Sequence, residues 1–187
     1  MSAITDIEKF LLKYMDLIED NKFEELYEQA RIEFPTNANI IIIPRLNGYF
    51  LQAGIDPLEY LEVIPAFFIQ YEEEITSITI PNHTKKIKDA AFRGLKIKEF
   101  IFPSKVTAIG NYCLSSNKEL DTVMLPKNPS SIGSYMFAEC EKLTGINYPG
   151  TKAEYLKSNF NKRKRWLTRS YIKRVICTDG FIEINQD

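Results

Sequence analysis

The chain has 187 residues, of which 44% are hydrophobic, 26% charged and 12% aromatic, a composition typical of folded proteins and not of disordered ones. The formal net charge of −1 conceals a division, because residues 1–74 contain 15 acidic and 5 basic side chains, whereas residues 75–187 contain 10 acidic and 19 basic ones. Such polarity can orient a partner or drive head-to-tail self-association. The alternative is that these are two segments with ordinary solvated surfaces, whose charge division has no such role.

Several classes of protein are disfavoured at this level. No stretch approaches the roughly 20 apolar residues of a membrane-spanning helix. The N-terminus has no basic region followed by an apolar core, so no signal peptide is expected. The three cysteines, Cys113, Cys140 and Cys177, are an odd number without a pair at metal-ligand spacing. A reduced, cytoplasmic setting without a bound metal or cofactor is therefore expected.

The N-terminal segment, residues 1–70, is predicted to be a helical domain. Apolar residues recur at helical spacing in four stretches, which run from Ile7 to Ile18, from about Lys22 to Ile32, from Leu46 to Ala53 and from Pro57 to Ile64. Thr5-Asp-Ile-Glu8 fits a capping box, and Asp56 before Pro57 fits an N-cap. The run from Ile40 to Ile43 is ambiguous between strand and buried helix, and residues 64–68 are expected to form a degenerate repeat unit at the end of this segment.

An internal repeat occupies residues 75–150. The pattern apolar-x-x-apolar-x-apolar-Pro occurs four times, ending at Pro81, Pro103, Pro126 and Pro149, with spacings of about 22–23 residues that suggest a solenoid. Each alternating segment is predicted to be a short strand, with Ile78, Phe100, Val123 and Ile146 stacked inside in one column. Proline then ends the strand because it cannot donate to a continuing ladder.

The rest of each unit repeats as well. Ile87, Ile109 and Ile132 occupy matching places, and Phe92, Leu114 and Phe137 follow five residues later. Residues 90–92 and 135–137 are predicted to form one helical or 3₁₀ turn each. Leu95, Asn117 and Cys140 share another register, which makes Cys140 a packing residue and not a reactive thiol.

These units resemble the BspA-type leucine-rich repeat of many bacterial and some viral proteins, most clearly in Ile78-Thr-Ile80-Pro81, Ala91-Phe92 and Ile109-Gly110. Leu114 departs from the usual aromatic, and Cys113 and Met136 from the usual alanine. The resemblance implies an α+β chain whose residues 71–150 form a right-handed solenoid with short parallel strands. It implies a fold and a binding scaffold, not an activity.

The last segment, residues 151–187, is predicted to be a basic cap. Thr151-Lys-Ala-Glu154 fits a second capping box, and a helix is expected there. Asp179-Gly180 between two β-rich runs is a strong hairpin signal. The hairpin would complete the sheet of the solenoid.

The outward residues of the predicted strands are the first candidate binding surface. They are Ser77, Thr79, Glu99, Ile101, Thr122, Met124, Gly145 and Asn147. Ile101 and Met124 are expected to be neighbours, giving an exposed apolar pair where a solenoid offers its binding face. The alternative is that a flanking helix covers them.

Cations in the last segment are the second candidate surface. Residues 152–174 contain nine cations and one acid, Glu154, and the predicted patch comprises Lys162, Arg163, Lys164, Arg165, Arg169, Lys173 and Arg174. An acidic protein surface, including the chain's own N-terminal part in a homo-oligomer, would satisfy it. With Trp166 and Tyr171 interleaved, nucleic-acid binding is the alternative.

No catalytic constellation is evident. His83, the single histidine, is expected in an exposed loop after a repeat proline, and no nucleophile motif accompanies it. The favoured function is therefore a non-enzymatic intracellular interaction module with a protein partner. The family resemblance alone suggests a phage- or bacterium-encoded adaptor or inhibitor of a host protein, and the missing secretion signal disfavours a cell-surface adhesin.

Overall fold

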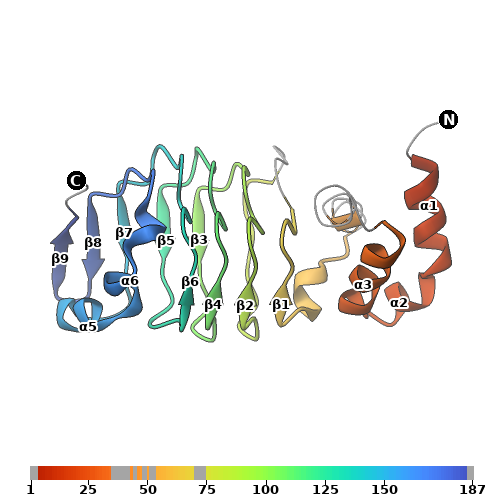
Figure 1. Cartoon of the computed structure of the whole chain (residues 1–187), viewed down its shortest axis with the longest axis horizontal. Helices are drawn as coiled ribbons and strands as arrows, with labels where there is room; N and C mark the ends of the chain where they lie inside the picture. The colour runs from red at the N-terminus through yellow and green to blue at the C-terminus, as the bar shows by residue number, and fades with distance from the viewer. Residues whose placement is uncertain are drawn as a thin grey trace.

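The computed structural model describes residues 4–34, 43, 46–47, 50, 54–69 and 75–184. The molecule is elongated, with helices at its N-terminal end followed by a stack of short strands that runs to the C-terminus (Figure 1). This arrangement matches the α+β solenoid expected from the sequence.

The N-terminal helices are α1 (Ile4–Lys13), α2 (Met15–Glu19) and α3 (Phe23–Glu33). The single helix predicted from Ile7 to Ile18 is thus two helices, which are separated at Tyr14. At this break the Tyr14 hydroxyl donates a hydrogen bond of 2.7 Å to the Glu33 carboxylate, which joins the first helices to α3. Because α1 already includes Thr5, Thr5 is not its N-cap.

Most of the third predicted helix and of the run from Ile40 to Ile43 lies outside the described residues. Ile43, Leu46, Asn47 and Phe50 are helical and buried.

The fourth predicted helix is wrong beyond its first turn. A 3₁₀ turn, η2 (Pro57–Tyr60), begins as expected with Asp56, whose carboxylate accepts a 3.0 Å hydrogen bond from the Leu58 amide. The next element, Val63–Ile64, is strand β1, which pairs in parallel with Lys86–Ile87. Pairing with a strand more than 20 residues away outweighs the local helical spacing, which is a weak preference by comparison.

Two parallel ladders form the solenoid, and the chain crosses from one to the other in every turn (Figure 1). Sheet A consists of β1 (Val63–Ile64), β2 (Lys86–Ile87), β4 (Ala108–Ile109) and β6 (Ser131–Ile132). Sheet B consists of β3 (Glu99–Ile101), β5 (Thr122–Met124), β7 (Gly145–Asn147), β8 (Arg174–Cys177) and β9 (Gly180–Glu183). The paired strands extend on both sides of residues 71–150, and the division of the chain into three domains stays a prediction.

The buried column inside sheet B is confirmed for three of its four predicted members. Phe100 pairs with Val123, and Ile146 pairs with Val175 of β8; all four are at most 1% exposed. Ile78 is half-buried, and residues 75–80 form no strand. Residues 75–80 form no parallel ladder with β3. Sheet B therefore begins at β3, one unit later than the repeat pattern predicted.

The turns that were predicted to be helical are tight non-helical turns. Ala90, Tyr112 and Tyr135 occupy equivalent places and have φ values of 51°, 55° and 59°, in the left-handed region that L-residues seldom adopt. Each donates its amide to the next unit, for example Ala90 to the Asn111 carbonyl at 2.8 Å. The inter-turn hydrogen bonds therefore fix a backbone conformation that side-chain periodicity does not reveal.

The C-terminal cap closes the last turn. Its helices are α5 (Lys152–Lys157), α6 (Asn159–Lys162) and the 3₁₀ turn η3 (Lys164–Leu167). The predicted capping box at Thr151 is present in full. Trp166 is fully buried and packs edge-on against Phe137 of the last turn at 5.9 Å between ring centroids. The predicted hairpin is β8–β9, with β8 parallel to β7.

Candidate functional site

The outer face of sheet B carries a row of mainly apolar side chains that crosses all five strands. Strand register aligns its members in the order Ile101, Met124, Asn147, Ile176 and Phe181. We call these five residues the apolar row. At a strand spacing of about 4.8 Å, the row is roughly 19 Å long.

The apolar row is accessible at both ends. Ile101 is 55% exposed, Ile176 40% and Phe181 56%, whereas Met124 and Asn147 are half-buried. The predicted contact between Ile101 and Met124 is confirmed by their pairing. The alternative that a flanking helix covers these residues does not hold for Ile101, more than half of whose surface remains exposed.

A second, polar row runs alongside the first. Glu99 pairs with Thr122, Gly145 with Arg174, and Arg174 with Glu183. Gly145 has no side chain of its own, and the Arg174 and Ile176 side chains pack over it, with atoms 3.4 Å from the position a Cβ would occupy. Carboxylates at the two ends of this row, with the cation Arg174 directly beside Glu183, give the sheet face a polar edge beside the apolar one.

The predicted residues Ser77 and Thr79 are exposed but are not on a strand. Together with Glu99, Ile101 and Pro103 they line a hollow of about 550 Å³. Ser77 and Thr79 therefore lie near Ile101 of the apolar row, although they are not members of the row.

Ile176 and Phe181 were missed as site residues. The sequence signal was present, because the hairpin at Asp179-Gly180 sets their pairing and the β-rich runs alternate on either side of it. The sequence did not indicate that β8 adds to sheet B with Ile176 in register with Asn147.

The predicted basic patch is not a single surface. Arg163 Nη1 approaches the Ser130 carbonyl at 3.4 Å, on the side of sheet A, whereas Arg174 lies in the polar row of sheet B. Arg169 forms an ion pair of 2.8 Å with Glu139. The consecutive cations Lys162, Arg163, Lys164 and Arg165 are all exposed. We call these four residues the basic run.

One of the two aromatic residues proposed for stacking on nucleic-acid bases, Trp166, is not available. Trp166 is 0% exposed, and its indole Nε1 donates a 2.9 Å hydrogen bond to the Phe160 carbonyl. Tyr171 is half exposed. Of the two stacking residues that single-stranded nucleic-acid binding would use here, only Tyr171 is accessible.

The side chains with potential for chemistry include the thiols of Cys113 and Cys140 and the imidazole of His83. Burial raises the pKa of the Cys140 thiol to about 12 and raises that of Cys113 further, so neither is a nucleophile at neutral pH. Cys140 is the packing residue that its register predicted, and its thiol lies 3.1 Å from the Leu114 carbonyl. His83 is half-buried, with its Nε2 atom buried, and is therefore not the exposed residue that was predicted.

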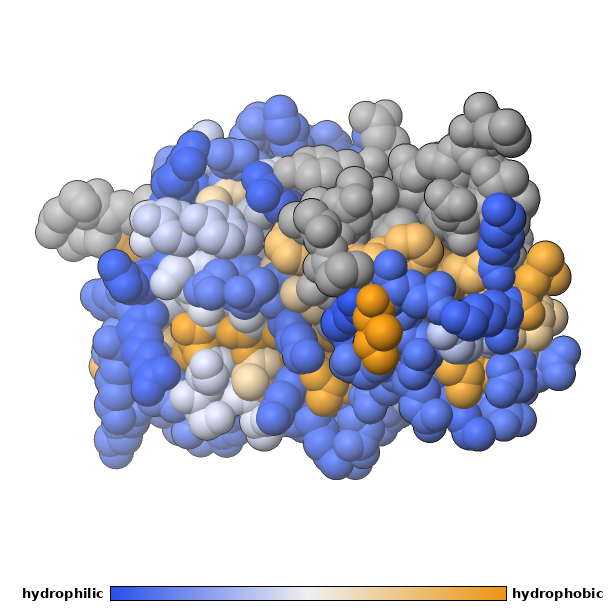
Figure 2. Space-filling view, turned by 45° about the vertical axis from the view of Figure 1, so that its right-hand side comes forward, coloured by the Kyte–Doolittle hydropathy of each residue, from blue (hydrophilic) through white to orange (hydrophobic). Residues whose placement is uncertain are grey.

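Metal-binding clusters and membrane-spanning helices are both absent from the described residues. These residues contain no group of three His, Cys, Asp or Glu side chains that could hold a metal ion. None of their helices has both the length and the apolar character to cross a membrane. The visible face in Figure 2 is mostly hydrophilic, with hydrophobic residues showing between the polar ones.

A comparison with protein families agrees with the repeat. A family model described as a BspA type leucine rich repeat region matches residues 62–182 in six copies. A crystal structure of a leucine-rich repeat protein from Eubacterium ventriosum ATCC 27560 is similar at a TM-score of 0.44 and 23% sequence identity. That match covers 49% of this chain and 25% of the other, so the chain matches about a quarter of that protein's length. No curated protein matches.

Proposed function

Since the chain belongs to the BspA-type leucine-rich-repeat family, we propose that it is a non-enzymatic module that binds a protein partner through the outer face of sheet B. Solenoids of stacked repeats offer extended surfaces to partners. The apolar row lies on such a surface and is the observation on which the proposal rests. The polar row beside it supplies a polar rim to this surface.

The size and composition of the surface suit protein recognition. Exposed aromatic and aliphatic side chains that gather at one place mark interaction sites, and aromatic anchors dominate binding energies. Phe181 and Ile176 form one such anchor pair, with Ile101 at the far end of the row. A row roughly 19 Å long matches the apolar stripe of an amphipathic helix of three to four turns, which is the partner shape we propose.

The test compares two double variants that carry the same chemical change. Ile101→Asp with Phe181→Asp places two charges in the apolar row, where both side chains are more than half exposed. Leu12→Asp with Ile32→Asp makes the same change on the helical head, where the two residues are 74% and 69% exposed. Met124 is less suitable for this purpose because it is half-buried.

Affinity capture from cell extract, quantified by mass spectrometry, should recover a protein that wild type and the head variant retain and the sheet variant loses by at least about tenfold. A photo-crosslinking residue at position 181 should label that protein, and one at position 12 should not. Equal recovery by both variants would refute the proposal. Nuclease treatment of the extract separates protein partners from those bridged by nucleic acid.

Finer statements about the partner rest on family resemblance. That the chain is a bacterial or phage adaptor or inhibitor of a host protein, and that it acts in the cytoplasm, stay predictions. Identification of a partner that is captured reproducibly is the measurement that tests these predictions.

A further inference from the structure

The basic run contrasts with the charges on the solenoid. Across neighbouring turns, lysines and glutamates pair at equivalent places, namely Lys85 with Glu62, Lys118 with Glu141 and Lys142 with Glu119. Within the described part of the chain, Lys162, Arg163, Lys164 and Arg165 form no ion pair. Among the described strands, none follows β6 in sheet A to place carboxylates opposite them.

A complementary acidic surface lies on α3. Glu24, Glu25 and Glu28 are exposed, and among the residues that the structure describes Glu24 and Glu25 have no ion-pair partner. The three carboxylates line a hollow of about 370 Å³ between α3 and β1, whose wall also includes the cations Arg31 and Lys88 and the apolar faces of Tyr27 and Val63. Glu28 pairs with Arg31, so Glu24 and Glu25 are the carboxylates of this hollow that remain for a partner. A long cationic side chain could lay its methylene groups on Tyr27 and Val63 and place its charge beside Glu24 and Glu25.

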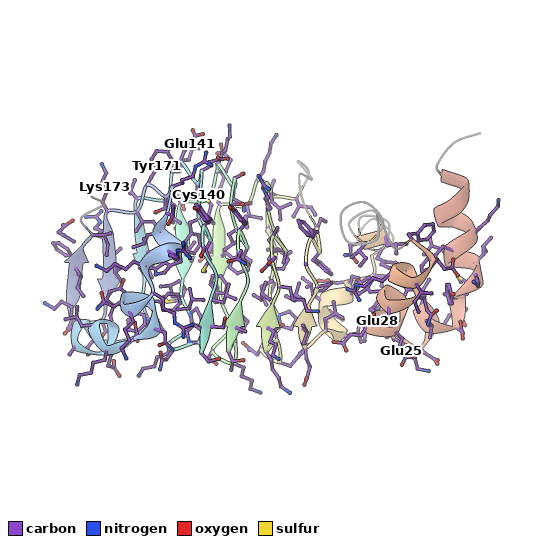
Figure 3. The ribbon with its side chains drawn as sticks, viewed as in Figure 1. Glu25, Glu28, Cys140, Glu141, Tyr171 and Lys173 are labelled. Atoms are coloured by element: carbon purple, nitrogen blue, oxygen red, sulfur yellow. The ribbon has the colours of Figure 1, made fainter. Side chains whose placement is uncertain are left out.

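The two surfaces lie at opposite ends of sheet A. The acidic hollow adjoins β1, the first strand of that sheet, through Val63. The basic run lies beyond β6, the last strand, where the Arg165 carbonyl accepts a 3.0 Å hydrogen bond from the Tyr135 amide. Figure 3 shows Glu25 and Glu28 at the helical end of the molecule, and the cap residues Tyr171 and Lys173 at the other end. One molecule therefore cannot bring the two surfaces together.

We propose that the acidic hollow of one copy binds the basic run of a second copy, head to tail along the solenoid axis. A contact between two different surfaces of the same chain leaves one of each free, so repetition gives an open chain or a closed ring. Pairs inside a hollow are less screened by solvent than the exposed pairs of the solenoid. The proposal is independent of the partner proposed for sheet B.

Sedimentation velocity of the full chain over a concentration series tests this association. At about 0.1 M salt, where charges are screened over roughly 10 Å, the sedimentation coefficient should rise with protein concentration; at about 1 M, where the distance is roughly 3 Å, it should stay that of the monomer. A monomer at every concentration in low salt would overturn the proposal. Oligomers that disappear after nuclease treatment would also overturn it, because the basic run would then be binding nucleic acid.

Charge reversal identifies the surfaces. Glu24→Lys with Glu25→Lys and, separately, Lys162→Glu with Lys164→Glu should each abolish self-association. An equimolar mixture of the two variants should recover it, because the reversed hollow of one fits the reversed run of the other. Recovery in the mixture also shows that both variants fold.

The matched control is Lys98→Glu with Lys105→Glu, which changes the net charge as much as the cap variant but on exposed solenoid positions. It should self-associate within about twofold of wild type. Loss of association in this control would show that net charge alone is responsible and would refute the docking of these two surfaces. The sheet B variant, Ile101→Asp with Phe181→Asp, should still self-associate, which separates this proposal from the previous one.

Discussion

Asn117 shows how one buried polar side chain joins neighbouring turns. It is 0% exposed, its Oδ1 accepts from the Leu95 amide at 2.9 Å, and its Nδ2 donates to the carbonyls of Phe92 and Leu114 at 2.8 and 2.7 Å. Cys140, in the equivalent place one turn later, bonds one carbonyl, that of Leu114. The periodic sequence places both residues in a packing register, but it does not predict that one of them satisfies three backbone groups.

We predict that Asn117→Ala lowers the free energy of unfolding by about 2–4 kcal/mol, since three buried backbone groups each lose a hydrogen bond, although the Leu114 carbonyl keeps that of the Cys140 thiol, and buried polar groups are costly to leave unpaired. Urea denaturation measures the loss. Asn82→Ala, at an exposed asparagine, is the control and should change the free energy of unfolding by less than about 0.5 kcal/mol. Equal effects at the two positions would contradict the role assigned to Asn117.

At the scale of elements, the alternating strands and the hairpin are predictable because side-chain period and turn chemistry are local properties. The same period misleads at residues 75–80, where the apolar pattern is present but no ladder forms. It also misleads at Val63–Ile64, where helical spacing continues into a strand. In both places the decisive factor is whether a neighbouring turn pairs with the backbone.

Neighbouring turns are in close contact at the edge of sheet A. This contact gives a prediction at the scale of elements. A Cβ at Gly133 would lie 2.2 Å from the carbonyl carbon of Gly110, so Gly133→Ala should push the turns apart and destabilise the fold by about 1–3 kcal/mol, as overpacking does. At Gly145 the nearest atoms to a Cβ are side-chain atoms at 3.4 Å, and Gly145→Ala should cost less than about 0.5 kcal/mol. Thermal unfolding of the two variants measures the difference, and a similar shift in both would show that the turns can separate freely.

For the whole molecule, buried residues form one continuous hydrophobic cluster from Phe10 in the head to Cys177 in the cap. Trp166 closes one end by packing on Phe137. Each turn depends on its neighbours, because a single unit cannot bury its apolar face alone. A continuous core of this kind favours joint unfolding of head, repeats and cap.

The single tryptophan is a natural reporter for this expectation. Because Trp166 is fully buried in the cap, its fluorescence should shift to the red at the same urea concentration at which far-ultraviolet circular dichroism reports loss of the whole fold. Separate midpoints, with the fluorescence change first, would show that the cap unfolds independently of the remaining turns.

The amino-acid sequence alone determined the repeat, its period and the inward positions of Phe100, Val123 and Ile146, since these follow from local side-chain pattern. It also placed Ile101 and Met124 together on the outer face. The tertiary structure alone decided that Ile176 and Phe181 extend this row, that Trp166 is buried, and that the basic residues divide between two sheets. Each of these depends on how segments far apart in the chain pair and pack, and such contacts leave no periodic trace in the sequence.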